Sequence, residues 1–276
     1  MPTEAEEKTM PHGRVRTRRR GRVAWIVLQC PPANTYSYEM MKDLDEAILA
    51  ARMDEEAEVI VLTGAGDRFF CAGADIGMLG EVTTRWKYSF CLHANETLLR
   101  FANTPKLVIA ALNGHCVGGG LEVALAADLR VARRAPEGGK DFQIGLPEVK
   151  LGVLPGTGGT QRLARLLGAA RAIEWMATAR VCNADEALAT GLVSKVLPFQ
   201  GFEDAVQEYA ESFTTPGSAA RAIGHVKRAV QGGIDLPLES GLALERELQQ
   251  RLFESADAKE GIAAYVAKRS PRFEGR

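Results

Sequence analysis

The sequence lacks most of the features that would place it in a special class of protein. Its five cysteines include no CxxC pair, which argues against a disulfide framework or a zinc site and favours a reducing compartment. With 34 basic and 35 acidic residues its net charge is −1, so no overall field attracts nucleic acid or an anionic membrane. No apolar run approaches the roughly 20 residues that a membrane helix requires, and the acidic start MPTEAEEKTM lacks an apolar secretory core. We therefore expect a cytoplasmic protein that binds neither membrane nor nucleic acid.

Several common catalytic signatures are missing as well. Glycine-rich stretches suggest nucleotide binding, but GGGLEV has Val123 and GTGGTQ has Gln161 where a dinucleotide fingerprint requires glycine or alanine. The sequence contains neither a phosphate-binding GxxxxGK[ST] motif nor a GxSxG serine motif. The four histidines stand apart from one another and from cysteine, so we predict no metal site. His115, beside a glycine triplet, either lines a cleft or is an ordinary buried histidine.

What is present is an alternation of strand and helix patterns over the first two thirds of the chain. Strand-like runs cover residues 23–30, 57–64, 106–114 and 128–134, and helical patterns cover 37–53, 84–102 and 120–127. Because these strands are apolar on both faces, they predict an α/β fold with a covered sheet. We expect a loose tail over residues 1–13, a core over 14–200, and a helical region over 201–276 that packs on the core and on a neighbouring subunit.

The basic stretch RVRTRRRGR, residues 14–22, leaves two interpretations open. It could be a basic arm that binds RNA. It also leads directly into the apolar run VAWIVLQC, which is typical of a solvated edge strand.

The stretch NGHCVGGGLEVALAADLRVA joins a glycine triplet to one carboxylate in an otherwise apolar helix pattern. Glycines between a strand and a helix leave backbone N–H groups free to point into a cleft, where the helix end adds a partial positive charge. Such donors stabilise negative charge that develops on an oxygen. Gly119 occupies this position, and Ala74 in CAGADI could supply a second donor. Glu122, in the first turn, is then either a catalytic carboxylate or a residue that only complements the helix dipole.

Two further features have a functional and a purely structural interpretation. Glu148, in GLPEVKLG, is a carboxylate among apolar residues in a tight loop, and by itself it is also typical of a surface turn. Trp86, Phe90, Leu98 and Phe101 lie at helical spacing, which is typical of a core but also of a helix that lines a pocket.

Taken together, four motifs resemble the enoyl-CoA hydratase/isomerase family, also called the crotonase family. The motifs are FFCAGADI, NGHCVGGGLEVALAADLRVA, LPEVKLGVLPGTGGTQRL and ADEALATGLVSKVLP. The resemblance runs from about residue 22 to the C-terminus. It implies an α/β fold, a crotonase-like ββα spiral core with a C-terminal helical trimerisation region, assembled as a trimer or a dimer of trimers.

The resemblance also implies roles for the residues found above. Members of the family hold the carbonyl oxygen of an acyl-CoA thioester with two backbone N–H groups, whose positions match Ala74 and Gly119. In the hydratases one glutamate activates water for addition at C3 and a second handles the proton at C2. These positions match Glu122 and Glu148. Coenzyme A is then part of the substrate, and no separate cofactor is needed.

Further positions are matched to the substrate, and some depart from the family pattern. The implied substrate contacts are Arg68, Ala72, Asp75, Ile76 and Gly156, with Tyr265 and Lys268 reaching the coenzyme A of an adjacent subunit. Gly77 and Leu146 replace a lysine and a glutamine common in hydratases, and the linker before Glu148 is longer than usual.

Both glutamates are present, which favours hydration over the other reactions of the family. The alternatives are double-bond isomerisation, thioester hydrolysis, hydration of a ring or branched enoyl-CoA, or a non-catalytic RNA-binding relative.

Overall fold

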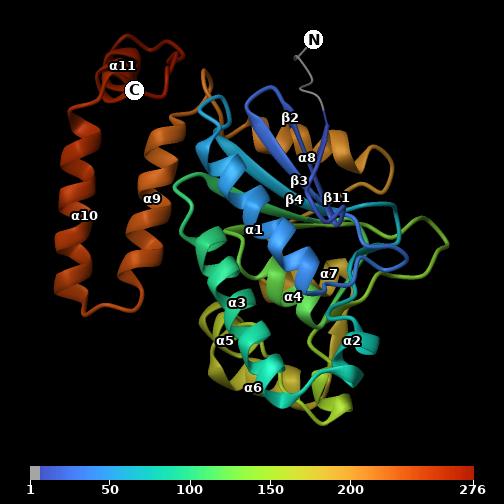
Figure 1. The fold of residues 1–276 in the computed structure, drawn as a ribbon. Coiled ribbons are helices and arrows are strands. Elements are labelled where there is room, and N and C mark those ends of the chain that lie inside the picture. Colours follow the sequence, from blue (N-terminus) through green and yellow to red (C-terminus); the bar gives the residue numbers. More distant parts are fainter. Residues whose placement is uncertain (1–6) are drawn as a thin grey trace.

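The computed structural model describes residues 7–276, which form two β-sheets and eleven α-helices (Figure 1). The large sheet contains, in spatial order, β1 (Lys8–Thr9), β2 (Val15–Arg20), β3 (Val23–Leu28), β4 (Val59–Gly64), β6 (Leu107–Leu112), β8 (Leu129–Arg133) and β11 (Lys195–Leu197). The small sheet contains β10 (Val181–Cys182), β9 (Ile144–Gly145), β7 (His115–Val117) and β5 (Phe69–Cys71). The α-helices are α1 (Tyr38–Met53), α2 (Ile76–Glu81), α3 (Thr84–Ala102), α4 (Gly119–Ala124), α5 (Gly159–Leu167), α6 (Ala169–Ala177), α7 (Ala184–Thr190), α8 (Phe202–Glu211), α9 (Ala220–Gly233), α10 (Leu238–Phe253) and α11 (Ala256–Val266).

Along the chain, strands of the large sheet alternate with strands of the small sheet. The chain runs from β4 to β5 and into α2 and α3, from β6 to β7 and into α4, and from β8 to β9 and into a 3-10 helix, η1 (Glu148–Leu151), before α5. The pairs β4–β6, β6–β8, β5–β7 and β7–β9 are all parallel. Each turn therefore consists of a strand in the large sheet, a strand in the small sheet and a helix, and the predicted ββα spiral is confirmed.

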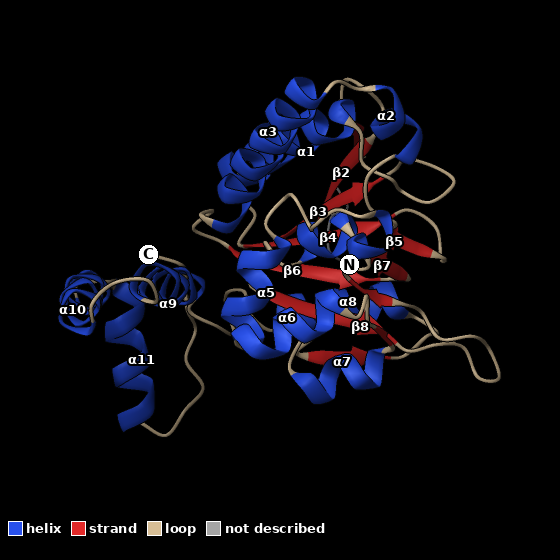
Figure 2. Cartoon of the chain, turned by 90° about the horizontal axis from the view of Figure 1, so that it is seen from below, coloured by secondary structure: helices blue, strands red, loops and turns tan. Residues whose placement is uncertain are grey.

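Both faces of the large sheet are covered, which explains why its central strands are apolar throughout. One face packs on α1, α3, α4 and the small sheet (Figure 2). The other face, which includes Trp25, packs on α8 through Phe202 and Val206. The indole Nε1 of Trp25 donates to Gln207 Oε1 at 2.7 Å, so the one polar atom of this large side chain is satisfied inside the core.

Helices α1 and α3 begin where short polar side chains can accept from their first turn. Ser37 accepts from Met40 N at the start of α1, and Thr83 accepts from Trp86 N at the start of α3. The predicted helices over 37–53 and 84–102 are confirmed. None of the described helices is long and apolar enough to cross a membrane.

The N-terminal region departs from the loose tail expected over residues 1–13. Residues 1–6 lie outside the described part of the chain. Lys8–Thr9 pairs with β2 as a short strand, and Met10 is buried. The amides of His12 and Arg14 donate to the two carboxylate oxygens of Asp43 at 2.9 and 2.7 Å, so buried hydrogen bonds order the chain before residue 14.

The basic stretch forms β2, a strand near the edge of the sheet. Its arginines form ion pairs with acidic side chains, such as Arg18 with Glu203 at 2.7 Å and Arg16 with Glu7 at 3.0 Å. This pairing favours the strand interpretation over a basic arm free to bind RNA.

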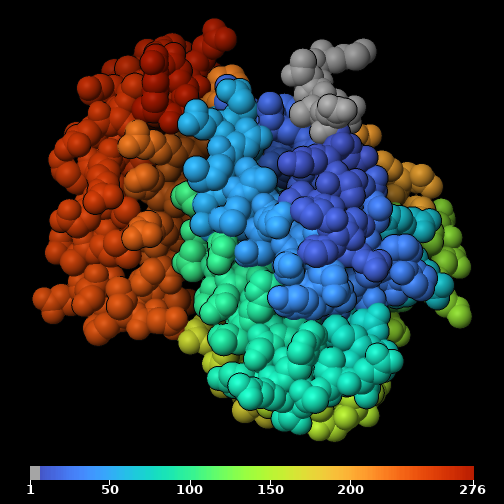
Figure 3. All heavy atoms as spheres, in the orientation of Figure 1, coloured from blue at the N-terminus to red at the C-terminus, as the bar shows by residue number. Residues whose placement is uncertain are grey.

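The last three helices, α9 to α11, form a separate layer along one side of the core (Figures 1 and 3). A buried ion pair attaches α9 to the core, where Lys227 Nζ lies 2.8 Å from Asp128 Oδ2. Lys227 Nζ also donates to the carbonyl oxygen of Lys106 at 3.0 Å.

Candidate active site

Two loops from successive turns of the spiral touch at the ends of β5 and β7. Gly73, at φ +90°, approaches the start of α4 so closely that an added Cβ would lie 3.1 Å from Gly119 N. Only glycine accepts this positive φ without strain. The next residue, Ala74, forms an isolated parallel bridge with Tyr36. The chain after β5 is thereby fixed against the first residue of α4.

The amides of Ala74 and Gly119 both remain available at this contact. Neither donates a hydrogen bond within residues 7–276, because the bridge uses Asp75 N rather than Ala74 N and the first amides of a helix have no intrahelical acceptor. Two unpaired donors on touching loops form an arrangement that can hold one oxygen atom and stabilise negative charge on it. The structure therefore brings together the two donors named from the sequence.

Glu122 is buried one turn into α4, with 2% of its surface exposed. Its Oε1 accepts from Thr157 N at 2.7 Å and from Gly159 N at 2.8 Å, and its Oε2 accepts from the Thr157 hydroxyl. Glycine at position 159 leaves room for this approach, because an added Cβ would lie 2.8 Å from Pro155 Cβ and 3.1 Å from Glu122 Cγ. The carboxylate is therefore held in one orientation by the loop before α5.

Glu148 is the first residue of η1, and it faces the same region from the other side. Its carboxyl oxygens are inaccessible to solvent and have no hydrogen-bond partner among the described residues. Burial, with a smaller contribution from the negative charge of Glu122, raises the pKa of Glu148 to about 7. Its Oε1 lies 3.2 Å from where a Cβ on Gly118 would stand, so the carboxyl group lies directly beside the start of α4.

The linker before Glu148 ends in β9, which fixes the chain immediately before that residue. Ile144 and Gly145 pair with Cys116 and Val117 in β7, and Gly118 N donates to Gly145 O at 2.9 Å. The part of the linker over residues 134–141 is a largely exposed loop.

Comparison with known proteins assigns the chain to a family. The sequence model of the enoyl-CoA hydratase/isomerase family matches residues 18–276. The chain belongs to this family. The short-chain-enoyl-CoA hydratase of Clostridium acetobutylicum is 36% identical over 250 residues, which cover 90% of this chain and 93% of that protein. The (E)-benzylidenesuccinyl-CoA hydratase of Thauera aromatica is 37% identical over 254 residues, which cover 92% and 96%.

Solved structures of the same family share the fold over the whole chain. An enoyl-CoA hydratase of Geobacillus kaustophilus has a TM-score of 0.91 at 41% identity, with 100% of both chains covered. An enoyl-CoA hydratase of Bacillus anthracis has a TM-score of 0.87 at 32% identity, covering 95% of this chain and 100% of that chain. Sequence and fold together identify an enzyme of the enoyl-CoA hydratase type.

The residues matched to substrate contacts in the family fall into two groups. Five lie in the segments before and after β5 or in the loop before α5. Ala72 N donates to Ala33 O, Asp75 caps α2 by accepting from Met78 N at 3.0 Å, and Ile76 begins that helix largely exposed. Arg68 is exposed in the β4–β5 loop, and Gly156 precedes the loop that binds Glu122, facing Cys91 of α3.

The second group does not reach the site of the same chain. Tyr265 is 86% exposed on α11, and Lys268 follows it with φ +53°. Both lie in the layer of C-terminal helices, away from α4 (Figure 1). Their assignment to the coenzyme A of an adjacent subunit stays a prediction.

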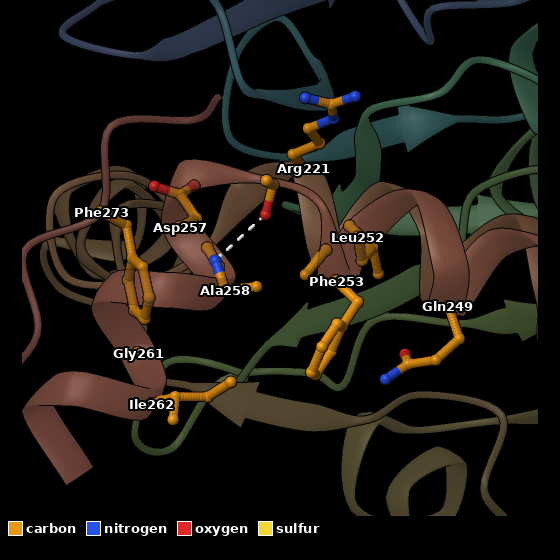
Figure 4. A pocket seen from close by; sticks show the side chains of 12 residues that line it. Arg221, Gln249, Leu252, Phe253, Asp257, Ala258, Gly261, Ile262 and Phe273 are labelled. Carbon is orange, nitrogen blue, oxygen red and sulfur yellow. Dashed lines mark hydrogen bonds between the residues drawn. The ribbon is translucent and has the colours of Figure 1, made fainter. Parts of the chain in front are cut away.

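A hollow of about 320 Å³ lies among these C-terminal helices and is distinct from the site (Figure 4). It is lined by Leu252, Phe253, Ile262 and Phe273, with Ala258 N donating to Ser255 Oγ at 3.0 Å along its edge. None of the residues matched to catalysis lines it.

Sequence reasoning missed two residues at the site, Tyr36 and Thr157. The Tyr36 ring lies so close to Gly119 that an added Cβ there would overlap it, and the Tyr36 hydroxyl lies 3.4 Å from Thr157 Oγ1. Thr157 lies within the motif LPEVKLGVLPGTGGTQRL, which does not mark its side chain, and Tyr36 lies 121 positions away outside the four motifs, so no local signal connects the two.

Proposed function

We propose that the chain is an enoyl-CoA hydratase that adds water reversibly across the C2=C3 bond of a (2E)-enoyl-CoA, giving a 3-hydroxyacyl-CoA. One observation carries this proposal. Within residues 7–276, two carboxyl groups, one fixed by three hydrogen bonds and one buried without a partner, lie beside a pair of unpaired backbone amides.

The amides of Ala74 and Gly119 stabilise the negative charge that the reaction creates on the substrate. Addition of water at C3 moves negative charge onto the thioester oxygen, and fixed donors at that oxygen lower the barrier. Loss of one such donor typically reduces the rate by about 10²–10³.

The two glutamates account for the two proton transfers. Glu122, held as a hydrogen-bond acceptor, orients the water and takes its proton as the oxygen bonds to C3. Glu148, whose pKa is raised to about 7, gives its proton to C2. Both groups act from one face of the double bond, which gives syn addition, and they exchange roles in dehydration. No further cofactor is needed, since one carboxyl group accepts the proton of water, the other supplies the proton to C2, and the two amides stabilise the charge on the oxygen.

We also propose that the enzyme assembles as a trimer or a dimer of trimers through its C-terminal layer. Several large apolar side chains of that layer are exposed in the single chain, among them Val226, Val230, Ile234 and Leu238. A groove of about 930 Å³ separates α9 from Leu154 and Leu166 near α5. Apolar surface of this extent favours contact with a partner chain.

The test is loss of the ultraviolet absorbance of the conjugated enoyl thioester. The panel contains crotonyl-CoA, longer straight-chain, branched and aryl enoyl-CoAs, the last because one relative is named for an aryl substrate. We expect fast hydration of at least one substrate by the wild type and a decrease in kcat of at least about 10³-fold in Glu122→Gln and in Glu148→Gln. Glu174→Gln, on the exposed face of α6, is the matched control and retains full activity.

Absence of hydration on every substrate would sink the hydratase proposal. Product analysis by mass spectrometry then distinguishes isomerisation, which leaves the mass unchanged, from hydrolysis, which releases coenzyme A.

A further inference from the structure

Glu122 is held by a hydroxyl group as well as by the backbone. The amides of Thr157 and Gly159 both bind Oε1, whereas Oε2 accepts only from the Thr157 hydroxyl within the described part of the chain. The two amides leave the carboxylate free to tilt about Oε1. The hydroxyl removes this freedom and leaves one lone pair of Oε2 for a water molecule.

The direction of the hydrogen bonds follows from the number of protons. An ionised carboxylate only accepts, so the single hydroxyl proton of Thr157 points to Glu122. Thr157 Oγ1 can then only accept from its other neighbour, the Tyr36 hydroxyl at 3.4 Å. Burial, and next the charge of Glu122, raise the pKa of Tyr36 well above its ordinary value, so the phenol keeps the proton that it donates.

Tyr36 is itself fixed by the loop that carries Ala74. Its amide donates to Gly73 O at 2.9 Å and its carbonyl oxygen accepts from Asp75 N at 3.1 Å. Its ring packs on Phe90 with centroids 5.8 Å apart, and both Tyr36 and Thr157 are buried. One residue therefore contacts the Ala74 loop through its backbone, Gly119 through its ring, and Thr157 through its hydroxyl.

We propose that Thr157 is a positioning residue that orients Glu122 toward the attacking water, and that Tyr36 keeps the Thr157 hydroxyl pointed at Glu122. The proposal rests on the proposed role of Glu122 in handling water. Thr157 holds the reacting carboxylate directly, and Tyr36 acts through Thr157.

The main test replaces the hydroxyl and leaves the shape of the side chain. Thr157→Val keeps both backbone bonds to Glu122, so we expect kcat to decrease about tenfold to thirtyfold while KM changes less than about twofold. Thr157→Ser restores the hydroxyl and is expected to recover most of kcat. The matched control is Thr160→Val at the start of α5, because the Thr160 hydroxyl accepts from Gln161 at 3.2 Å and does not contact Glu122.

Tyr36→Phe tests whether the Tyr36 hydroxyl orients the hydroxyl of Thr157. The 3.4 Å hydroxyl contact is longer than an ideal hydrogen bond, so a smaller decrease in kcat, about twofold to fivefold, is expected. In the Thr157→Val background, Tyr36→Phe is expected to cause no further decrease, since the phenol then has no hydroxyl to orient. An equal decrease in both backgrounds would show that Tyr36 acts on the substrate itself and would overturn its part of the proposal.

Crystal structures of the variants give a readout that does not require activity. We expect Glu122 Oε2 to move away from its wild-type position in Thr157→Val and to stay in Thr157→Ser. An active wild type with unchanged kcat and unchanged Glu122 in Thr157→Val would overturn the proposal and leave the hydratase function intact. A wild type inactive on all enoyl-CoAs would overturn the hydratase function, and movement of Glu122 would then still decide the positioning role.

Discussion

The carboxyl group of Glu148 is buried beside a second carboxylate. This position lowers the stability of the fold at neutral pH, but it provides the protonated carboxyl group that the proposed reaction needs. An exposed glutamate is fully ionised at neutral pH. Here burial raises the pKa to about 7, so the group both holds and releases a proton in the range where the enzyme works.

The pH dependence of activity follows from this value. In the proposed mechanism the productive enzyme carries one proton on its pair of glutamates, whichever direction the reaction takes. We therefore expect kcat/KM for hydration and for dehydration to decrease together, about tenfold per pH unit, above pH 7. Initial rates from pH 5.5 to 9 test this, with the circular dichroism spectrum as a control for folding. A flat profile across that range would contradict it.

The same group also makes stability depend on pH. Its pKa is raised from 4.5 to about 7 on folding, so the folded chain binds the proton more tightly than the unfolded chain. The free energy of unfolding therefore decreases as pH rises from about 4.5 to about 7. At pH 8 we expect Glu148→Gln to be more stable than the wild type by about 1–2 kcal/mol, after allowing for solvent screening of a half-buried group. At pH 4 the two proteins should differ little in thermal denaturation, and an equal difference at both values would contradict the assignment.

At the residue scale, the sequence predicts those site residues that stand close together in one motif. Glu122 and Gly119 are neighbours on one helix, so their spacing indicates that they act together. Thr157 contacts Glu122, and Tyr36 contacts Thr157. Both are tertiary contacts, which a single sequence does not encode in any local pattern. The raised pKa of Glu148 likewise depends on loops that meet only after folding.

At the scale of elements, α4 tolerates little change at its first residue, Gly119. A Cβ on Gly119 would overlap the Tyr36 ring, which is buried and cannot move without displacing Phe90. We expect Gly119→Ala to reduce kcat at least about 10²-fold by misaligning the amide. Gly80→Ala in α2, where nothing lies within 4 Å of the added Cβ, is the matched control and should retain activity. Comparable kcat for the two variants would exclude an oxyanion role for the Gly119 amide.

A second prediction concerns the attachment of α9. Asp128 accepts from Val108 N at 2.8 Å and from Gln231 at 2.6 Å, and its charge is balanced by Lys227. Lys227→Met removes the ion-pair partner of that buried charge, so we expect a loss of about 3–5 kcal/mol in the free energy of unfolding. The double variant with Asp128→Asn should recover part of this loss in thermal or urea denaturation. A neutral Lys227→Met would show that α9 is attached mainly by apolar contacts.

The elements that the sequence predicted are long or strongly patterned. The runs over 23–30, 57–64 and 106–114 became β3, β4 and β6, because each is apolar enough to be buried on both faces. The run over 128–134 became β8 although it buries Arg130 and Arg133, whose guanidinium groups donate to backbone carbonyl oxygens. The strands of the small sheet have only two or three residues, which is too short for any periodicity to appear. Their positions are set by the pairing of β7 with β5 and β9.

At the scale of the whole molecule, the exposed apolar face of the C-terminal layer leads to a prediction about mass. We expect sedimentation equilibrium to give three or six times the chain mass of 29.8 kDa. Charged residues at two exposed positions of this face, as in Val230→Asp with Ile234→Asp, should weaken the assembly, because two charges would be buried at the contact. Arg228→Asp on the same helix is a control for the change of charge alone. A monomer at micromolar concentration of the wild type would contradict the assembly.

The contact between Trp25 and α8 has a consequence for synthesis on the ribosome. Trp25 and Gln207 are 182 positions apart, so the sheet face that contains Trp25 cannot be covered until α8 has left the exit tunnel. At ordinary rates of translation this interval lasts about 10 to 40 s. During that time the nascent chain presents a broad apolar strip to its surroundings. Until α8 covers it, this apolar surface can associate with other unfolded chains, so the order of synthesis leaves this face of the sheet exposed the longest.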